Sequence, residues 1–343
     1  MYAFISSIRR YLFDKGIFKS SEFDLPIINV GNLAVGGSGK TPHIEYIIRL
    51  LIPEFKVATL SRGYGRKTKG YREVNVDSTA QESGDEPLQI KNKFPNIKVF
   101  VGEERVAAIP KILFDYPEID VILLDDAYQH RAIKAGFNVL LTDYSKIFTQ
   151  DKSMPFGRLR EYPKAANRSD LIVVTKCPEI ISQKENDNLK TEIQSFTDSE
   201  VLFSKIQYGE LVPFGNINKT NTIENILVIS ALANPKPMLD YINTKYKPTN
   251  IEHLEYRDHY NFSKNDISTL IEKFNSFAEQ NKIIIISEKD AIRLRAVTKG
   301  TAFDNLGVFI LPIKISFIAE SKEIFNDKII NYVRENKANH SIY

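Results

Sequence analysis

The sequence has little of what marks a secreted or membrane-spanning protein. Its 343 residues contain a single cysteine, Cys177, which excludes an internal disulfide. The longest apolar runs, such as Ile283 to Ile286, have the length of a strand, far below the roughly 20 residues that cross a bilayer. Charges interrupt the first apolar stretch, unlike the pattern of a secretory signal. We therefore expect a protein of the reducing cytosol, either soluble or bound to a membrane surface.

Charge of one sign is also scarce. The chain carries 46 lysine and arginine residues against 43 aspartate and glutamate residues, for a net charge of +3. Proteins that hold nucleic acid by bulk charge carry a much larger basic excess, so we expect no nucleic-acid partner. Hydrophobic residues make up 43% of the chain, enough for full cores, and the length suggests two domains.

What is present is an alternation of short β-rich runs with helical segments. Helices are predicted over 40–51 and 103–114, and strands at 26–30, 56–60, 97–101, 119–124, 138–142 and 171–175. Strands that alternate with helices indicate parallel βαβ units, and wholly apolar strands indicate a sheet covered on both faces. We expect an α/β/α domain with a mainly parallel sheet over 23–207.

A second alternation follows a segment rich in proline, glycine and asparagine at 208–222, which we interpret as a linker. Residues 223–343 therefore predict a smaller α/β domain, with ligands of both units at the carboxyl ends of their strands. The apolar spacing over 323–335 predicts a last helix that closes the fold and packs back on the first domain.

Residues 1–22 predict a basic amphipathic helix. Arg9 and Arg10 lie opposite an apolar stripe formed by Phe4, Ile5, Ile8 and Leu12. Such a helix either docks in a membrane interface, with its cations at the headgroups, or packs on the core of its own domain. The residues alone leave both interpretations open.

The segment INVGNLAVGGSGKTP, residues 28–42, is typical of a P-loop because a strand runs through glycines into Gly-Lys-Thr and a helix. Backbone amides of such a loop converge on phosphate oxygens at the helix N-terminus. Lys40 would bridge the β- and γ-phosphates, and Thr41 would ligate Mg²⁺. Ala34 stands where the strict pattern has glycine. The predicted phosphate ligands are Gly36, Gly37, Ser38, Gly39, Lys40 and Thr41.

A second motif, VILLDD at residues 121–126, is an apolar strand that ends in two acids. It predicts a Walker B element in which Asp125, and with it Asp126, holds Mg²⁺. GTPase signatures are absent from the sequence: Tyr128 stands where their glycine would follow, and the segment TKCP at 175–178 lacks their aspartate. ATP is therefore the expected nucleotide.

Further polar clusters follow strands, which favours one active cleft between two domains. They are LSRGYGR with Arg62 and Arg66, ESGDEP with Asp85 and Glu86 on an expected loop, PFGRLREYP with Arg158, Arg160 and Glu161, YRDHYNF with Asp258 and His259, and SEKDAIR at 287–293.

Taken in order, GNLAVGGSGKTP, LSRGYGR, GDEP, VILLDDAYQH, PFGRLREYP, VVTK, DHYNF and EKD resemble the tetraacyldisaccharide 4′-kinases, the lipid A kinases, over nearly the whole chain. This resemblance implies two α/β/α domains joined by a short β linker. It also implies transfer of the ATP γ-phosphoryl group to the 4′-hydroxyl of a tetraacylated glucosamine disaccharide 1-phosphate. The reaction would occur on the cytoplasmic face of the inner membrane, which favours the membrane-docking interpretation of residues 1–22. We expect a monomer.

The resemblance also implies roles at the site. Asp85 would be the general base for the sugar hydroxyl, with His259 as its partner, and Glu86 would contact the metal together with Thr41, Asp125 and Asp126. Phosphates of ATP or the 1-phosphate of the substrate would be bound by Arg62, Arg66, Arg158 and Arg160 beside Glu161. Two other interpretations stay open: a P-loop ATPase switch that binds a partner without a small-molecule acceptor, and a soluble kinase of a nucleoside or sugar.

Overall fold

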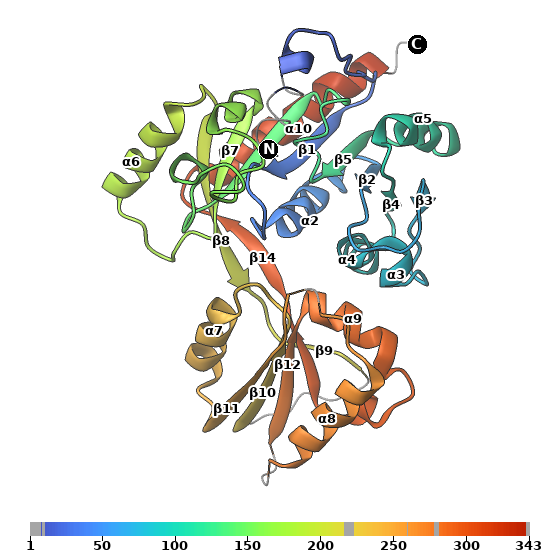
Figure 1. Ribbon diagram of the computed structural model, residues 1–343, viewed down its shortest axis with the longest axis vertical. Coiled ribbons are helices and arrows are strands. Elements are labelled where there is room, and N and C mark those ends of the chain that lie inside the picture. Colours follow the sequence, from blue (N-terminus) through green and yellow to red (C-terminus); the bar gives the residue numbers. More distant parts are fainter. Residues whose placement is uncertain (1–7, 9–10, 216–222, 259, 278–280, 341–343) are drawn as a thin grey trace.

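The chain folds into two α/β units, placed one above the other in Figure 1. This computed structural model describes residues 8, 11–215, 223–258, 260–277 and 281–340. The first unit holds a nine-stranded sheet in the order β14-β8-β7-β6-β1-β5-β2-β4-β3, and the second a five-stranded sheet in the order β11-β10-β12-β13-β9. The expected α/β class with mainly parallel sheets is confirmed.

The central strands of the first sheet are parallel and buried, as the apolar runs predict. Antiparallel strands stand at the two edges, where β3 pairs with β4 and β14 pairs with β8. The strands are β1 (Ile27–Asn32), β2 (Val57–Ser61), β3 (Arg72–Glu73), β4 (Lys98–Val101), β5 (Val121–Asp125), β6 (Phe137–Asp143), β7 (Leu171–Thr175), β8 (Glu200–Tyr208) and β14 (Ile313–Phe317).

Helices cover both faces of this sheet. One face packs against α2 (Lys40–Leu51), α4 (Asp85–Lys93) and α10 (Ser321–His340), and the other against α5 (Arg105–Asp115) and α6 (Gln183–Gln194). The short helix α3 (Ala80–Ser83) precedes α4, and 3₁₀ turns lie at Phe148–Gln150 and Pro163–Arg168. In a parallel sheet the chain leaves every strand at the same, carboxyl edge, so the P-loop, Asp125 and the residues after β2 and β7 lie at that edge.

The second unit repeats the arrangement on a smaller scale. Helix α7 covers one face of its sheet, and α8 and α9 cover the other. Its elements are β9 (Val212–Pro213), β10 (Asn225–Ser230), α7 (Lys236–Tyr246), β11 (Asn250–Glu255), α8 (Lys264–Asn275), β12 (Lys282–Ser287), α9 (Glu288–Thr298), a 3₁₀ turn at Ala302–Asn305 and β13 (Val308–Leu311).

The chain crosses the junction between the two units, which we call the waist, twice. It leaves along β8 and returns along β14, and the two strands pair antiparallel with Ile313 opposite Tyr208 (Figure 1). After this return, α10 packs on the first unit, where Phe325, Ile329 and Val333 are fully buried. Residues 313–340 thus fold with the first sheet. The sequence-based division places 223–343 in the smaller domain, with the last helix expected to pack back on the first. Within the expected linker, 208–215 contribute the end of β8 and strand β9, and 216–222 lie outside the described residues.

The N-terminal segment is described only in part. Residues 11–14 are helical, and Asp14 forms an ion pair of 2.6 Å with Arg131. Ile8, Tyr11, Ile17 and Phe18 are exposed, while Phe4, Ile5, Arg9 and Arg10 lie outside the described residues. Among the described helices, none combines the length and the apolar character needed to cross a membrane.

Candidate active site

The P-loop leaves the carboxyl end of β1 and enters α2 at Lys40. Gly39 is the N-cap of α2 with φ 82°, and Gly36 has φ 107°. These left-handed conformations favour glycine because a Cβ would clash with the backbone. The first turn of α2 therefore points its free amides toward the space in front of the loop, which is the arrangement that binds phosphate.

A neighbouring segment holds the start of the P-loop in an extended conformation. The amide of Val35 donates to the carbonyl of Arg158 at 2.8 Å, and the amide of Arg160 donates to the carbonyl of Leu33 at 2.7 Å. Ala34 lies between them and bridges Leu159. Extended backbone accepts any side chain, which explains how alanine replaces the glycine of the strict motif.

The far side of the P-loop is held by the end of β7, a contact that sequence reasoning missed. Thr175 Oγ1 donates to the carbonyl of Ser38 at 3.0 Å. Lys176 Nζ donates to the carbonyl of Gly37 and forms an ion pair of 2.8 Å with Asp143. The VVTK motif carried this signal, but the sequence interpretation used it to exclude guanine and to recognise the family resemblance, and assigned no role to Thr175 or Lys176.

Lys40 lies among polar groups at the carboxyl edge of the sheet. Its Nζ is 3.6 Å from Asp126 Oδ2 and 3.4 Å from Asn32 Oδ1. Arg160 also contacts both residues, with Asp126 Oδ1 at 2.8 Å and the Asn32 carbonyl at 2.9 Å. Burial works against ionisation of Asp126, but Lys40 and Arg160 outweigh it and lower the pKa of this carboxyl.

Asp125 ends β5 and is buried, with 4% of its surface exposed. Within the described part of the chain, its Oδ1 atom has no hydrogen-bond partner. Burial, reinforced by the negative charge of Glu86, raises the pKa of Asp125 to about 7. A buried carboxylate oxygen without a partner, together with the buried Thr41 in the first turn of α2, fits Mg²⁺, which takes one or two carboxylates and completes its shell with phosphate and water. The described residues hold no group of three or more ligating side chains that would bind a metal without such additional ligands.

Asp85 and Glu86 begin helix α4, which corrects the expectation of a loop. The turn before them requires Gly84, because its φ is 90° and a Cβ would lie 2.9 Å from the carbonyl oxygen of Tyr64. Glu86 interacts electrostatically with Lys40 and Asp126. Burial alone would raise its pKa, but an ion pair of 2.8 Å with Lys289 turns the balance and lowers it.

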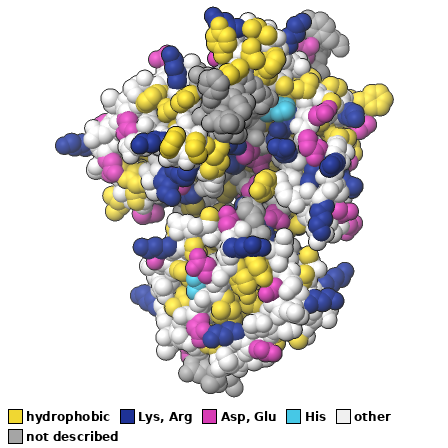
Figure 2. Space-filling view, in the orientation of Figure 1, with side chains coloured by type: hydrophobic (Ala, Val, Ile, Leu, Met, Phe, Trp, Pro, Cys, Tyr) yellow, Lys and Arg dark blue, Asp and Glu magenta, His cyan; other side chains and the backbone are white. Residues whose placement is uncertain are grey.

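The second unit reaches these acids through α9. Nε and Nη2 of Arg293 both donate to Asp85 Oδ2, at 2.8 and 2.6 Å, while Lys289 pairs with Glu86. Acidic and basic side chains gather along the waist in the space-filling view (Figure 2). The motif SEKDAIR had been singled out from the sequence, but no role was assigned to either cation.

Other predicted residues are engaged elsewhere. Arg66 is buried beside Glu103 at 2.7 Å, Arg158 pairs with Asp151 at 2.9 Å, and Glu161 pairs with Arg168 at 2.9 Å. Arg62 is exposed after β2. His259 lies outside the described residues. The structure therefore brings Arg160, Lys40, Asp126 and Glu86 together. Arg158 lines a pocket beside Gly36, Gly37 and Ser38 while it pairs with Asp151, whereas Arg66 and Glu161 hold loops.

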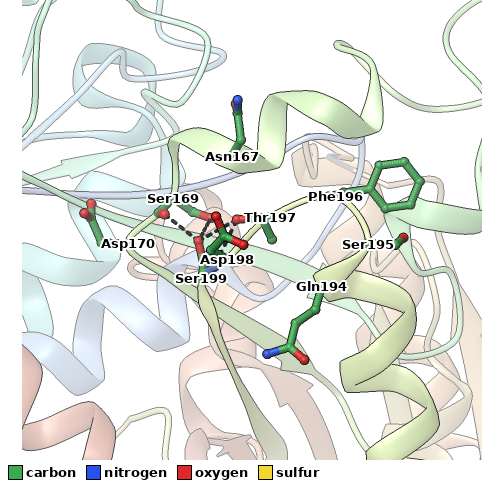
Figure 3. Close-up of a pocket in the computed structure, with 9 residues that line it drawn as sticks. All are labelled: Asn167, Ser169, Asp170, Gln194, Ser195, Phe196, Thr197, Asp198 and Ser199. Carbon is green, nitrogen blue, oxygen red and sulfur yellow. Dashed lines mark hydrogen bonds between the residues drawn. The ribbon is translucent and has the colours of Figure 1, made fainter.

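A separate polar pocket of about 440 Å³ lies at the amino ends of β7 and β8, opposite the P-loop edge (Figure 3). Ser169, Thr197 and Ser199 bond mainly to one another there. Its described lining contains two aspartates and no lysine or arginine, so it offers no positive charge for a phosphate.

Comparison with known proteins decides the family. The sequence profile of the tetraacyldisaccharide-1-P 4′-kinases (LpxK) matches residues 1–333. The chain belongs to this family. It is 41% identical to the tetraacyldisaccharide 4′-kinase of Bacteroides fragilis, over 98% of this chain and 92% of that protein. It is 42% identical to the Flavobacterium psychrophilum protein of the same name, over 99% of this chain and 96% of that protein.

A solved structure agrees with this assignment. The crystal structure of LpxK from Aquifex aeolicus in complex with ATP superposes with a TM-score of 0.72 at 25% identity, covering 97% of this chain and 96% of that one. The resemblance stated from the motifs is confirmed, and with it an ATP-dependent kinase of lipid A biosynthesis. Membership in this family favours the kinase over the switch protein and over the soluble sugar kinase.

Proposed function

We propose that the chain transfers the γ-phosphoryl group of ATP to the 4′-hydroxyl of a tetraacyl glucosamine disaccharide 1-phosphate. The observation that carries this proposal is the family match over residues 1–333 together with a P-loop whose Lys40 lies in the same charged cluster as Glu86 of the GDEP motif. In the reaction, the hydroxyl oxygen forms a bond to the γ-phosphorus as the bond to the β-γ bridging oxygen breaks. ADP leaves, and the hydroxyl proton needs an acceptor.

Asp85 is the proposed acceptor of that proton, with His259 as its partner. A sugar hydroxyl is a weak nucleophile at neutral pH, so a carboxylate within about 3 Å of it assists as the new bond forms. The two hydrogen bonds from Arg293 fix the Asp85 carboxylate in one orientation. The first turn of α4 presents Asp85 and Glu86 on consecutive residues, so one helix start would serve both the acceptor and the metal side of the site.

Lys40, Arg160 and the P-loop amides would bind the ATP phosphates, with Arg62 as a further phosphate ligand at the exit of β2. Lys40 and Arg160 both form ion pairs with Asp126. Both are cationic hydrogen-bond donors, which suits them to bind a triphosphate. Mg²⁺ would be held by Thr41 and Asp125, with Glu86 and Asp126 beside them, and would neutralise the β- and γ-oxygens. We propose that the chain acts as a monomer at the cytoplasmic face of the inner membrane, with residues 1–22 docked on that surface.

The test is transfer of label from γ-labelled ATP to purified tetraacyl disaccharide 1-phosphate in detergent. We expect Lys40→Ala to abolish transfer, because the phosphoryl group loses its main cation. Asp85→Asn is expected to keep ATP binding and lower kcat by about 10²- to 10⁴-fold, the range for loss of a general base.

Two results would contradict the proposal in different ways. If the unaltered protein transfers no label to the disaccharide, the disaccharide is not the substrate. Normal transfer by Asp85→Asn would show that Asp85 is not the general base, without contradicting the proposed substrate.

A further inference from the structure

Helices α4 and α9 join the two units through a row of opposite charges. Three ion pairs among the described residues connect them: Lys93 with Glu288 at 2.6 Å, Glu86 with Lys289 at 2.8 Å, and Asp85 with Arg293 at 2.6 Å. In each pair, one partner stands on a helix of the P-loop unit and the other on the first two turns of α9. The proposed base and the proposed metal ligand are thus both paired with cations from the second unit.

Arg293 differs from an ordinary surface partner because it is buried, with 5% of its surface exposed. Its two donors converge on a single oxygen of Asp85, at 2.8 and 2.6 Å. Two converging hydrogen bonds restrict the rotation of the carboxylate more than a single bond does.

Arg293 is itself held by its own unit. Asp290, one turn earlier on α9, lies 3.7 Å from Nη1 of Arg293 and is fully buried. The Asp290 carboxylate accepts hydrogen bonds from Ser287 Oγ at 2.6 Å and from the amide of Ala231 at the end of β10. The position of Arg293 is therefore set by the β10 and β12 ends of the second sheet.

We propose that Arg293 is a positioning residue for phosphoryl transfer, which orients the Asp85 carboxylate and makes the second unit part of the active site. This inference rests on the proposed role of Asp85. A misplacement of a reacting group by about 1 Å lowers a rate by about 100-fold. Arg293 need not touch ATP or the disaccharide for this effect.

The rival explanation is that Arg293 only fastens the two units. Glu288 offers a matched control, because its ion pair with Lys93 also crosses between α4 and α9 but touches neither Asp85 nor Glu86. Glu288→Gln removes the charge of that pair and leaves Lys93 its second partner, Glu45, at 2.6 Å.

The experiment is a kinetic double-mutant cycle on the full chain with Arg293→Met, Asp85→Asn and the double variant. We expect Arg293→Met to lower kcat by 10- to 100-fold with the KM for ATP changed less than twofold, and Arg293→Lys to recover part of kcat. In the Asp85→Asn background, Arg293→Met should cost nothing further, because a residue that acts through Asp85 has no effect once Asp85 is gone. Glu288→Gln should stay within twofold of the unaltered protein.

The inference is overturned if folded Arg293→Met keeps its kcat, if it lowers kcat by the same factor with and without Asp85, or if its effect appears in the KM for ATP. A thermal unfolding scan establishes that each variant is folded, and the cycle is run with Arg293→Lys if the methionine variant is not. Full activity of Asp85→Asn would contradict both the assignment of Asp85 as general base and the positioning role of Arg293. Failure of the unaltered protein to label the disaccharide would instead remove the proposed substrate.

Discussion

Asp125 and Asp126 are neighbours in sequence with opposite electrostatic behaviour. Burial and the adjacent Glu86 raise the pKa of Asp125 to about 7. Burial also acts on Asp126, yet Lys40 and Arg160 lower its pKa. Neighbouring carboxyls whose pKa values are shifted in opposite directions are typical of functional sites. Carboxyls with a purely structural role rarely leave a buried oxygen without a hydrogen bond. A pKa of about 7 means that Asp125 changes its protonation state near neutral pH, where Asp126 is already ionised.

This difference predicts a proton release when Mg²⁺ binds. A metal requires the ionised carboxylate, so binding near pH 7 should release a fraction of a proton from Asp125, and affinity should fall by up to about tenfold per pH unit as the pH drops below 7. Calorimetry of Mg²⁺ with ADP, in two buffers of different ionisation enthalpy, measures the release.

Asp125→Asn is expected to lose the release. Asp126→Asn is expected to keep most of it, because burial and Glu86 raise the pKa of Asp125 more than the charge of Asp126 does. Equal proton release by the unaltered protein and by Asp125→Asn would show that the proton comes from another group.

At the level of elements, the sequence predicts best where one local pattern decides. The predicted helix over 40–51 is α2, and the predicted strand at 171–175 is β7. Several elements have no predicted counterpart, and α4 and β14 show the physical reasons. Helix α4 begins with acids and a proline, residues that favour a helix N-terminus as much as a turn. Strand β14 begins directly after Pro312, and its partner β8 lies more than a hundred residues earlier, so its pairing is set by tertiary structure.

The same limit applies to the site. The P-loop, Asp125 and Asp126 could be predicted because the P-loop directly follows β1 and the two acids stand at the end of β5. The contacts of Arg293 with Asp85 and of Lys289 with Glu86 depend on how α9 docks on α4, which no local pattern encodes. Arg66 and Glu161 were assigned to phosphate or substrate binding by motif, but the structure pairs them with Glu103 and Arg168.

The β7 exit predicts an effect on nucleotide affinity. Lys176→Met removes the hydrogen bond to the Gly37 carbonyl and the ion pair with Asp143. Hydrogen bonds to charged groups contribute about 1.5–3 kcal/mol. Without them the P-loop is less ordered before ATP binds, so we expect most of this free energy to be lost from ATP binding.

The dissociation constant for ATP should therefore rise about tenfold, as measured by calorimetry. The control is Lys205→Met, which removes an ion pair with the exposed Glu179 and should leave ATP binding unchanged. A variant at Lys176 with unaltered affinity would show that the P-loop holds its shape without β7.

At the scale of the whole molecule, the second unit is inserted into the first. The chain leaves along β8 and returns along β14, and α10 then completes the first core (Figure 1). The Tyr332 hydroxyl accepts a hydrogen bond from the Ile27 amide at 3.1 Å and lies 3.2 Å from the Ile27 carbonyl. The last helix is thereby bonded to the strand that leads into the P-loop.

This closure predicts that a change in α10 destabilises the P-loop unit. Phe325→Ala removes a fully buried ring and should cost about 3–5 kcal/mol of the free energy of unfolding, measured by denaturant titration.

Asn331→Ala, on the exposed side of the same helix, should change that free energy by less than about 0.5 kcal/mol. Equal stability of the two variants would contradict the burial of Phe325 in the first core.

The insertion also fixes an order of events during synthesis. When the ribosome has made strand β8, the first sheet still lacks its edge strand β14, and the face under α10 still exposes apolar side chains of the core. The five-stranded unit must be translated before these gaps are filled, and domains generally fold as units in the order in which they emerge. The nucleotide-binding unit can therefore complete its fold only after α10 has left the ribosomal exit tunnel.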